Sequence, residues 1–201
     1  MDLSITFIIC WMMWICVTFF ASKQNTWRLP GAAFILLVIC LLPLEWSGSQ
    51  ILIRPVMFLF FLAGIGVTSR LSSIIRIRTY ILACSFAFLF ASFRLAEWYE
   101  PVIFLFGRVP TYVVSFSLVF IIFFRSNRER LACALLSGCG GELLYQSHIF
   151  SFTSVYVAGE TFFLNYVVCI AAVGLVTNII SSLIFSRKPA TSFSHLHLPG
   201  S

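Results

Sequence analysis

Long stretches without a charged residue are the feature that most limits what this chain can fold into. No Asp, Glu, Lys or Arg occurs between Leu3 and Ser22, or between Thr161 and Ser186. Inside a bilayer, backbone N–H and C=O groups find no water, so such a stretch has to be a helix that satisfies these groups internally. A hydrocarbon core about 30 Å thick needs about 20 apolar residues per helix, and both stretches supply them. The sequence therefore predicts transmembrane helices.

The same reasoning extends to the whole chain, because 60% of its residues are apolar and only 10% are charged. Soluble domains carry about 25% charged residues. We predict an all-α fold, a polytopic bundle of seven transmembrane helices over residues 1–188, followed by a flexible cytoplasmic tail over 189–201. The fifth span begins either at Pro101 or after Pro110. The predicted spans are 3–22, 29–46, 51–69, 77–96, 102–124, 131–149 and 161–185.

The basic residues predict the orientation of these spans. Ten of the 13 lysines and arginines fall in alternate breaks between spans and at the start of the tail, and three fall on the other side with six of the seven acids. Basic residues near span ends mark the cytoplasmic side. The N-terminus is therefore expected outside and the C-terminus in the cytoplasm, in the cell membrane.

Ionisable residues within apolar stretches are costly in hydrocarbon and by default indicate a site. All six such residues fall in the outer half of their predicted spans, so they could converge on one outward-facing polar pocket. A plainer alternative is that they snorkel to the headgroups, meet water at helix ends, or pair to neutralise one another. The six candidates are Glu142, Arg108, Arg94, Glu97, Arg54 and His148.

Glu142 is the most informative of these candidates. It lies about twelve residues into its span, or about 16 Å from the inner end. A carboxylate at that depth must be protonated, paired with an arginine, or facing water, and an arginine of the outer half is the expected partner. Gln146 shares its helix face, whereas His148 does not. Arg94 and Glu97 have the spacing to pair on their own helix.

Several function classes lack their sequence signals. No H-E-x-x-H, G-x-S-x-G, Walker or G-x-G-x-x-G motif occurs. The seven cysteines lie in apolar stretches without a C-x-x-C pair, which argues against a zinc site or a disulfide framework. Neither a cofactor nor a metal is expected. The net charge of +6 comes from short basic clusters between spans, which act as topology signals rather than a nucleic-acid site.

The first functional hypothesis is therefore a non-enzymatic accessory or regulatory membrane protein that works through helix contacts. Its expected partners are the lipid bilayer and another membrane protein, and no nucleic acid. The alternative is a small transporter or solute-binding protein that uses the outer polar pocket. A lipid-modifying enzyme with Glu142 or His148 as acid or base ranks third.

Three short motifs resemble one family. They are Trp11-Met12-Met13-Trp14 in the first span, Trp27-Arg28 in the loop after it, and Gly141-Glu142-Leu143-Leu144-Tyr145 in the sixth span. In these features the chain resembles the YphA-like small multi-pass membrane proteins of Gram-positive bacteria. The resemblance implies a bacterial plasma membrane location and supplies no activity, cofactor or catalytic residue.

Overall fold

The computed structural model describes residues 3–20, 26–104, 107–124 and 126–186. Within these ranges the chain is mostly helical, as predicted, and one helix overlaps each predicted span. The helices are α1 (Leu3–Ile15), continued by a π-helix (Cys16–Phe20), α2 (Arg28–Leu41), α3 (Val56–Ser69), α4 (Ser73–Tyr99), α5 (Arg108–Phe123), α6 (Asn127–Thr153) and α7 (Thr161–Ser186). The strands are β1 (Trp46–Ser47), β2 (Ile51–Ile53) and β3 (Tyr156–Ala158).

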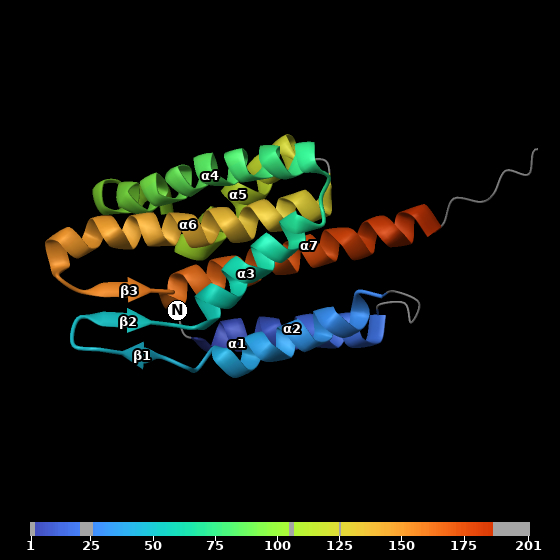
Figure 1. The fold of residues 1–201 in the computed structure, drawn as a ribbon, viewed down its shortest axis with the longest axis horizontal. Helices are drawn as coiled ribbons and strands as arrows, with labels where there is room; N and C mark the ends of the chain where they lie inside the picture. Colours follow the sequence, from blue (N-terminus) through green and yellow to red (C-terminus); the bar gives the residue numbers. More distant parts are fainter. Residues whose placement is uncertain (1–2, 21–25, 105–106, 125, 187–201) are drawn as a thin grey trace, which may run out of the picture.

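The three strands form a small sheet at one end of the bundle, which we call the sheet end (Figure 1). β1 pairs antiparallel with β2, with Trp46 opposite Ile53. β2 pairs parallel with β3, with Ile51 opposite Tyr156. The start of α1 lies at the same end, and α7 runs away from it to the opposite end. The sheet therefore joins the connection between α2 and α3 to the connection between α6 and α7.

This sheet corrects the predicted helices over 29–46 and 51–69. The second helix ends at Leu41, next to Pro43, whose ring clashes with a preceding helical turn and whose nitrogen cannot donate. The third helix begins only at Val56, directly after Pro55. The apolar residues between the two helices form strands, because they find partners in each other and in β3.

The start of the fifth helix also differs from both predicted positions. Pro101–Phe104 forms a single 3-10 turn, and α5 begins at Arg108. Gly107 before it has φ 98°, a conformation that glycine adopts without steric cost. Pro110 lies in the first helical turn, where the N–H groups have no partner within the helix.

α6 and α7 hold the bundle together. α6 packs against α3 and α4, and α7 packs against α1, α5 and α6. At Gly141, α6 and α4 approach closely, because a Cβ there would lie 2.7 Å from Cδ1 of Phe90 and 2.9 Å from the carbonyl oxygen of Ala87. The α1–α7 contact includes a buried hydrogen bond from Thr6 Oγ1 to Asn165 Oδ1.

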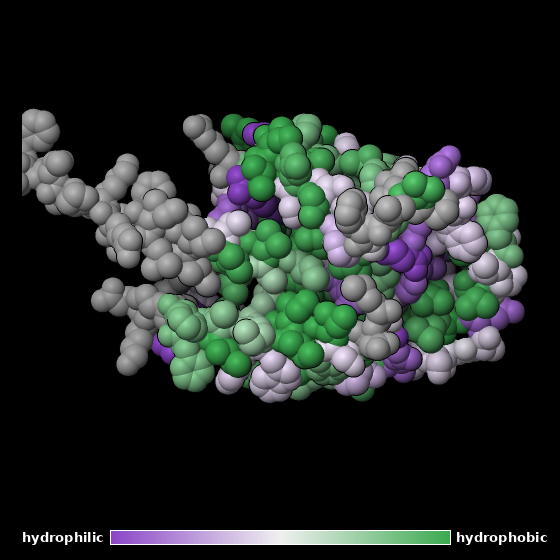
Figure 2. Space-filling view, turned by 180° about the vertical axis from the view of Figure 1, so that it is seen from behind, coloured by the Kyte–Doolittle hydropathy of each residue, from purple (hydrophilic) through white to green (hydrophobic). Residues whose placement is uncertain are grey.

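The surface and two of the helices suit a bilayer. Figure 2 shows hydrophobic residues over the middle of one face and hydrophilic residues gathered towards its two ends. Among the described residues, Leu3–Phe20 and Ser73–Tyr99 are each long and apolar enough to cross a membrane by themselves. Arg28–Leu41, Val56–Ser69 and Arg108–Phe123 are apolar but shorter, and a further apolar stretch, Thr161–Thr177, lies within the longer α7.

Candidate functional site

Three arginines and four glutamates meet at the sheet end, around the start of α7. We call this set the arginine–glutamate cluster. It joins residues from α4, α5, α6 and the segments that flank β1, β2 and α7. Its members are Arg54, Arg94, Arg108, Glu45, Glu97, Glu142 and Glu160.

Arg94 of α4 is the centre of the cluster. Its Nη1 donates to Glu142 Oε2 over 3.2 Å, and its Nη2 donates to Glu160 Oε2 over 2.6 Å. The guanidinium carbon lies 4.1 Å from the ring centroid of Tyr145 and 4.6 Å from that of Phe162. A buried cation is tolerated only with such compensation, and the aromatic faces add cation–π attraction. Arg94 is therefore a cross-link between α4, α6 and α7.

Glu142 of α6 is completely buried, and its two oxygens have separate partners. Oε2 accepts from Arg94, and Oε1 accepts from Gln146 Nε2 over 3.1 Å and from the backbone N–H of Glu160 over 3.4 Å. The prediction that Glu142 pairs with an arginine is confirmed. The side chains of Arg94 and Glu142 are 1% and 0% exposed, so this pair belongs to the packed interior.

Arg54 ties the sheet to α7. Its Nε donates to Glu45 Oε1 over 3.0 Å, and its Nη1 donates to Thr161 Oγ1 over 2.8 Å. Gly159 stands beside it with φ 84°, and a Cβ there would lie 3.2 Å from Cβ of Arg54. A glycine is needed at this turn, because the backbone is left-handed and the arginine stem is close.

Arg108 forms the outer part of the cluster. It donates through Nε to Glu97 Oε1, joining the start of α5 to the end of α4. Its guanidinium carbon lies 5.7 Å from the ring centroid of Phe162, the ring that also contacts Arg94. The Arg108 side chain is 54% exposed, so this pair is partly screened by solvent and contributes less than the Arg94 pair.

The structure brings together five of the six predicted site residues and separates the sixth. His148 is exposed on α6, with its ring 5.4 Å from that of Phe152. The Arg94–Glu97 pair that the i, i+3 spacing allows does not form, because each side chain has its partner on another helix. The buried carboxylate of Glu142 requires Arg94, which leaves Glu97 to Arg108.

Two acids of the cluster, Glu45 and Glu160, were predicted only as flanking charges. The balance of charge in the predicted pocket was the sequence feature that could have identified them. Three arginines were assigned to the pocket against only two glutamates, Glu97 and Glu142, so a further acid was required to neutralise them.

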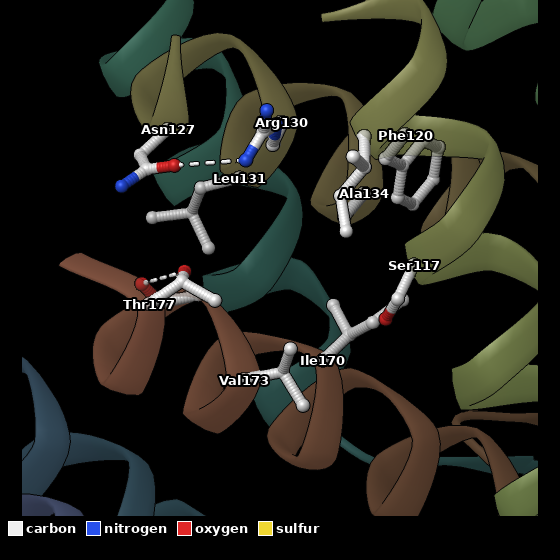
Figure 3. Close-up of a pocket in the computed structure, with 11 residues that line it drawn as sticks. Ser117, Phe120, Asn127, Arg130, Leu131, Ala134, Ile170, Val173 and Thr177 are labelled. Carbon is white, nitrogen blue, oxygen red and sulfur yellow. Dashed lines mark hydrogen bonds between the residues drawn. The ribbon is translucent and has the colours of Figure 1, made fainter. Parts of the chain in front are cut away.

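Two cavities lie away from the cluster. A cavity of about 40 Å³ lies between α5, α6 and α7 (Figure 3). It is lined by Ser117, Phe120, Ile121, Asn127, Arg130, Leu131, Ala134, Ile170, Val173, Gly174 and Thr177. A second hollow of about 740 Å³ runs along α6 between α3 and α4, and we call it the α3–α4 groove. Its lining includes Phe61, Ile65, Tyr80, Ala83, Cys84, Ala87, Phe88, Leu136, Gly140, Leu143, Leu144, Ser147 and Tyr156.

The cluster lines neither of these two cavities, and its contacts are those of an ion network that runs from the buried Arg94–Glu142 pair to the partly exposed Arg108 and Glu45. Its carboxylates are engaged by arginines and backbone groups. No group of three or more His, Cys, Asp or Glu side chains in the described part of the chain is placed to hold a metal ion.

Apolar helices joined by a buried ion network define a helical integral membrane protein. The chain belongs to the family of YphA-like integral membrane proteins, whose family model matches residues 2–194. This confirms the resemblance inferred from the sequence motifs. No curated protein and no solved structure matches the chain.

Proposed function

We propose that this protein is a seven-span protein of the bacterial plasma membrane that acts without catalysis, as an accessory or regulatory subunit that binds a transmembrane helix of a partner protein. The observation that carries this proposal is the α3–α4 groove. The groove is open on the side of the bundle and is lined almost entirely by apolar residues.

The floor of the groove favours a helix as its occupant. Ala83, Ala87 and Gly140 present small side chains there. A Cβ at Gly140 would lie only 3.2 Å from Cβ of Ala87, so α4 and α6 meet closely beneath the groove. Lipid tails are as apolar as protein side chains, so helices associate in membranes through close packing, which small residues permit. Phe61, Ile65 and Phe88 form part of the walls.

The arginine–glutamate cluster supports this reading because it fixes the walls of the groove. Arg94 and Glu142 join α4 to α6, and Arg54 lies two residues before α3 and bonds to Thr161 of α7. A groove held open by such contacts loses little freedom when a partner binds, which favours affinity.

The seven-span topology leads to a prediction for reporter fusions. The three arginines of the sheet end are all paired with glutamates, so the orienting basic charge lies at the opposite end. Alkaline phosphatase inserted after Gly48 is expected to be active, and the same reporter fused at Ser201 is expected to be inactive. An active reporter at Ser201 would overturn the orientation.

Two native cysteines provide a test of the groove. Cys84 is exposed and lines the groove, whereas Cys40 is exposed on α2. Native membranes treated with a maleimide–benzophenone crosslinker and light should yield one discrete protein adduct. We expect Cys84→Ala to abolish this adduct and Cys40→Ala to retain it, as judged by gel mobility and mass spectrometry of the crosslinked peptide.

Two outcomes of this experiment would count against the proposal. Label recovered from Cys84 only on lipid would show that acyl chains fill the groove. An adduct consisting of two copies of this chain would show that the groove binds a second copy of the same protein, and not a different partner subunit.

A second candidate function, transport or binding of a small solute or proton, is supported by one observation. Arg94 and Glu142 meet inside the bundle, and the buried Nε of Arg94 has no hydrogen-bond partner among the described residues. The Glu142→Gln variant distinguishes this candidate from the first, as argued in the Discussion.

A further inference from the structure

Four buried polar atoms between α4, α5 and α7 lack a hydrogen-bond partner among the described residues. They are Nε of Arg94, Oη of Tyr112, Oη of Tyr166 and Oγ of Ser117. Tyr112 and Tyr166 are both 0% exposed. In native proteins more than about 90% of buried polar groups are satisfied by protein or ordered water. Each unsatisfied buried group destabilises the folded state, so this concentration points to a bound polar ligand.

The residues that carry these atoms follow one another through the interior. The Phe162 ring lies 4.6 Å from the guanidinium carbon of Arg94 and 4.9 Å from the Tyr112 ring centroid. The Tyr112 ring centroid in turn lies 6.4 Å from that of Tyr166. We call these residues, Arg94, Phe162, Tyr112 and Tyr166, the tyrosine seam.

The tyrosine seam continues towards the cavity shown in Figure 3. The Tyr166 ring centroid lies 5.8 Å from that of Phe116, and Ser117, the next residue, lines the cavity. The cavity also contains Asn127 and Arg130, which are joined by a hydrogen bond of 3.2 Å. Its volume of about 40 Å³ is sufficient for a water molecule, which requires at least about 10–15 Å³ by the same measure.

We propose that the tyrosine seam binds a file of ordered water molecules that connects this cavity with the Arg94 side of the arginine–glutamate cluster. Water fits these partners, because a hydroxyl both donates and accepts whereas the Arg94 Nε only donates. The path would bring solvent to a buried ion pair from the end of the bundle opposite the sheet. This inference is independent of the α3–α4 groove and gives the second candidate function a physical route.

Radiolytic hydroxyl-radical footprinting of the unmodified protein in lipid nanodiscs tests the proposal, because radicals formed from bound water oxidise the side chains beside it. Relative to the reactivity of the free amino acids, Tyr112 and Tyr166 are expected to be oxidised several-fold faster than Phe163, which is equally buried at 0% exposure. Oxidation of both tyrosines at no more than the relative rate of Phe163 would overturn the proposal.

A substitution provides an independent measurement. If water bonds to the Tyr166 hydroxyl, Tyr166→Phe should lower the midpoint temperature of unfolding, because it removes a satisfied hydrogen bond. Tyr145→Phe is the control, since Tyr145 Oη accepts a direct hydrogen bond of 3.0 Å from Trp98 Nε1. An unchanged or higher midpoint for Tyr166→Phe alone would contradict the proposal, because removal of a bare buried hydroxyl is neutral or stabilising.

Discussion

Arg94→Met is expected to lower the free energy of unfolding by about 3–5 kcal/mol, the cost of breaking a buried ion pair from one side. The substitution leaves Glu142 uncompensated at 0% exposure and also removes the contact with Glu160. Unfolding in detergent micelles and the abundance of a fluorescent fusion in membranes measure the effect.

The matched control is Arg128→Met, which replaces an exposed arginine on α6. Exposed substitutions usually change stability by no more than about 0.5 kcal/mol. Equal decreases in the free energy of unfolding of the two variants would show that Arg94 has no special structural role.

Glu142→Gln separates the structural and transport roles of the same pair. If the pair holds the bundle together, Glu142→Gln alone should reduce abundance, and combining it with Arg94→Met should recover part of the loss by removing both charges. If the pair carries protons or binds a solute, abundance should stay normal while activity is lost. Glu142→Leu without effect on abundance, stability or phenotype would contradict both roles.

Gly141→Ala is expected to destabilise the protein by about 1–3 kcal/mol or more, as overpacking of a tight interior does. The added Cβ would lie 2.7 and 2.8 Å from side-chain atoms of Phe90 and 2.9 Å from the carbonyl oxygen of Ala87. The backbone atom cannot rotate away, so α4 and α6 must separate. Thermal unfolding of the purified variant measures this change.

Gly66→Ala is the control for helix propensity. Gly66 lies within α3, and a Cβ there meets nothing within 4 Å. This variant should be neutral or more stable by about 0.5–1 kcal/mol, the usual gain of alanine over glycine in a helix. Similar destabilisation of both variants would refute the close packing of α4 on α6.

The helices could be predicted because apolar stretches and charge breaks are local signals. The strands could not be predicted with the same certainty. The short apolar run Ile51-Leu52-Ile53 is compatible with both a helix and a strand. Its conformation depends on pairing with Trp46–Ser47 and with residues 156–158. Pro43 and Pro55 were local signs that the two helices end short of the predicted bounds.

The sequence predicted most of the residues of the candidate site, but not which arginine pairs with which glutamate. Depth in an apolar stretch singled out Arg94, Glu142 and their neighbours, since charge there always requires compensation. Which arginine meets which glutamate depends on helix packing. The spacing of Arg94 and Glu97 therefore suggested a pair that the contacts across helices replace.

The order of the cluster along the chain has a consequence for biogenesis. The arginines at positions 54, 94 and 108 are synthesised first, whereas Glu142 and Glu160, the two acids that bind Arg94, arrive only with the last two helices. A nascent chain that stops after α5 therefore lacks both acids that pair with Arg94, and charge within an apolar stretch is strongly disfavoured. Completion of the ion network thus distinguishes a finished chain from a truncated one.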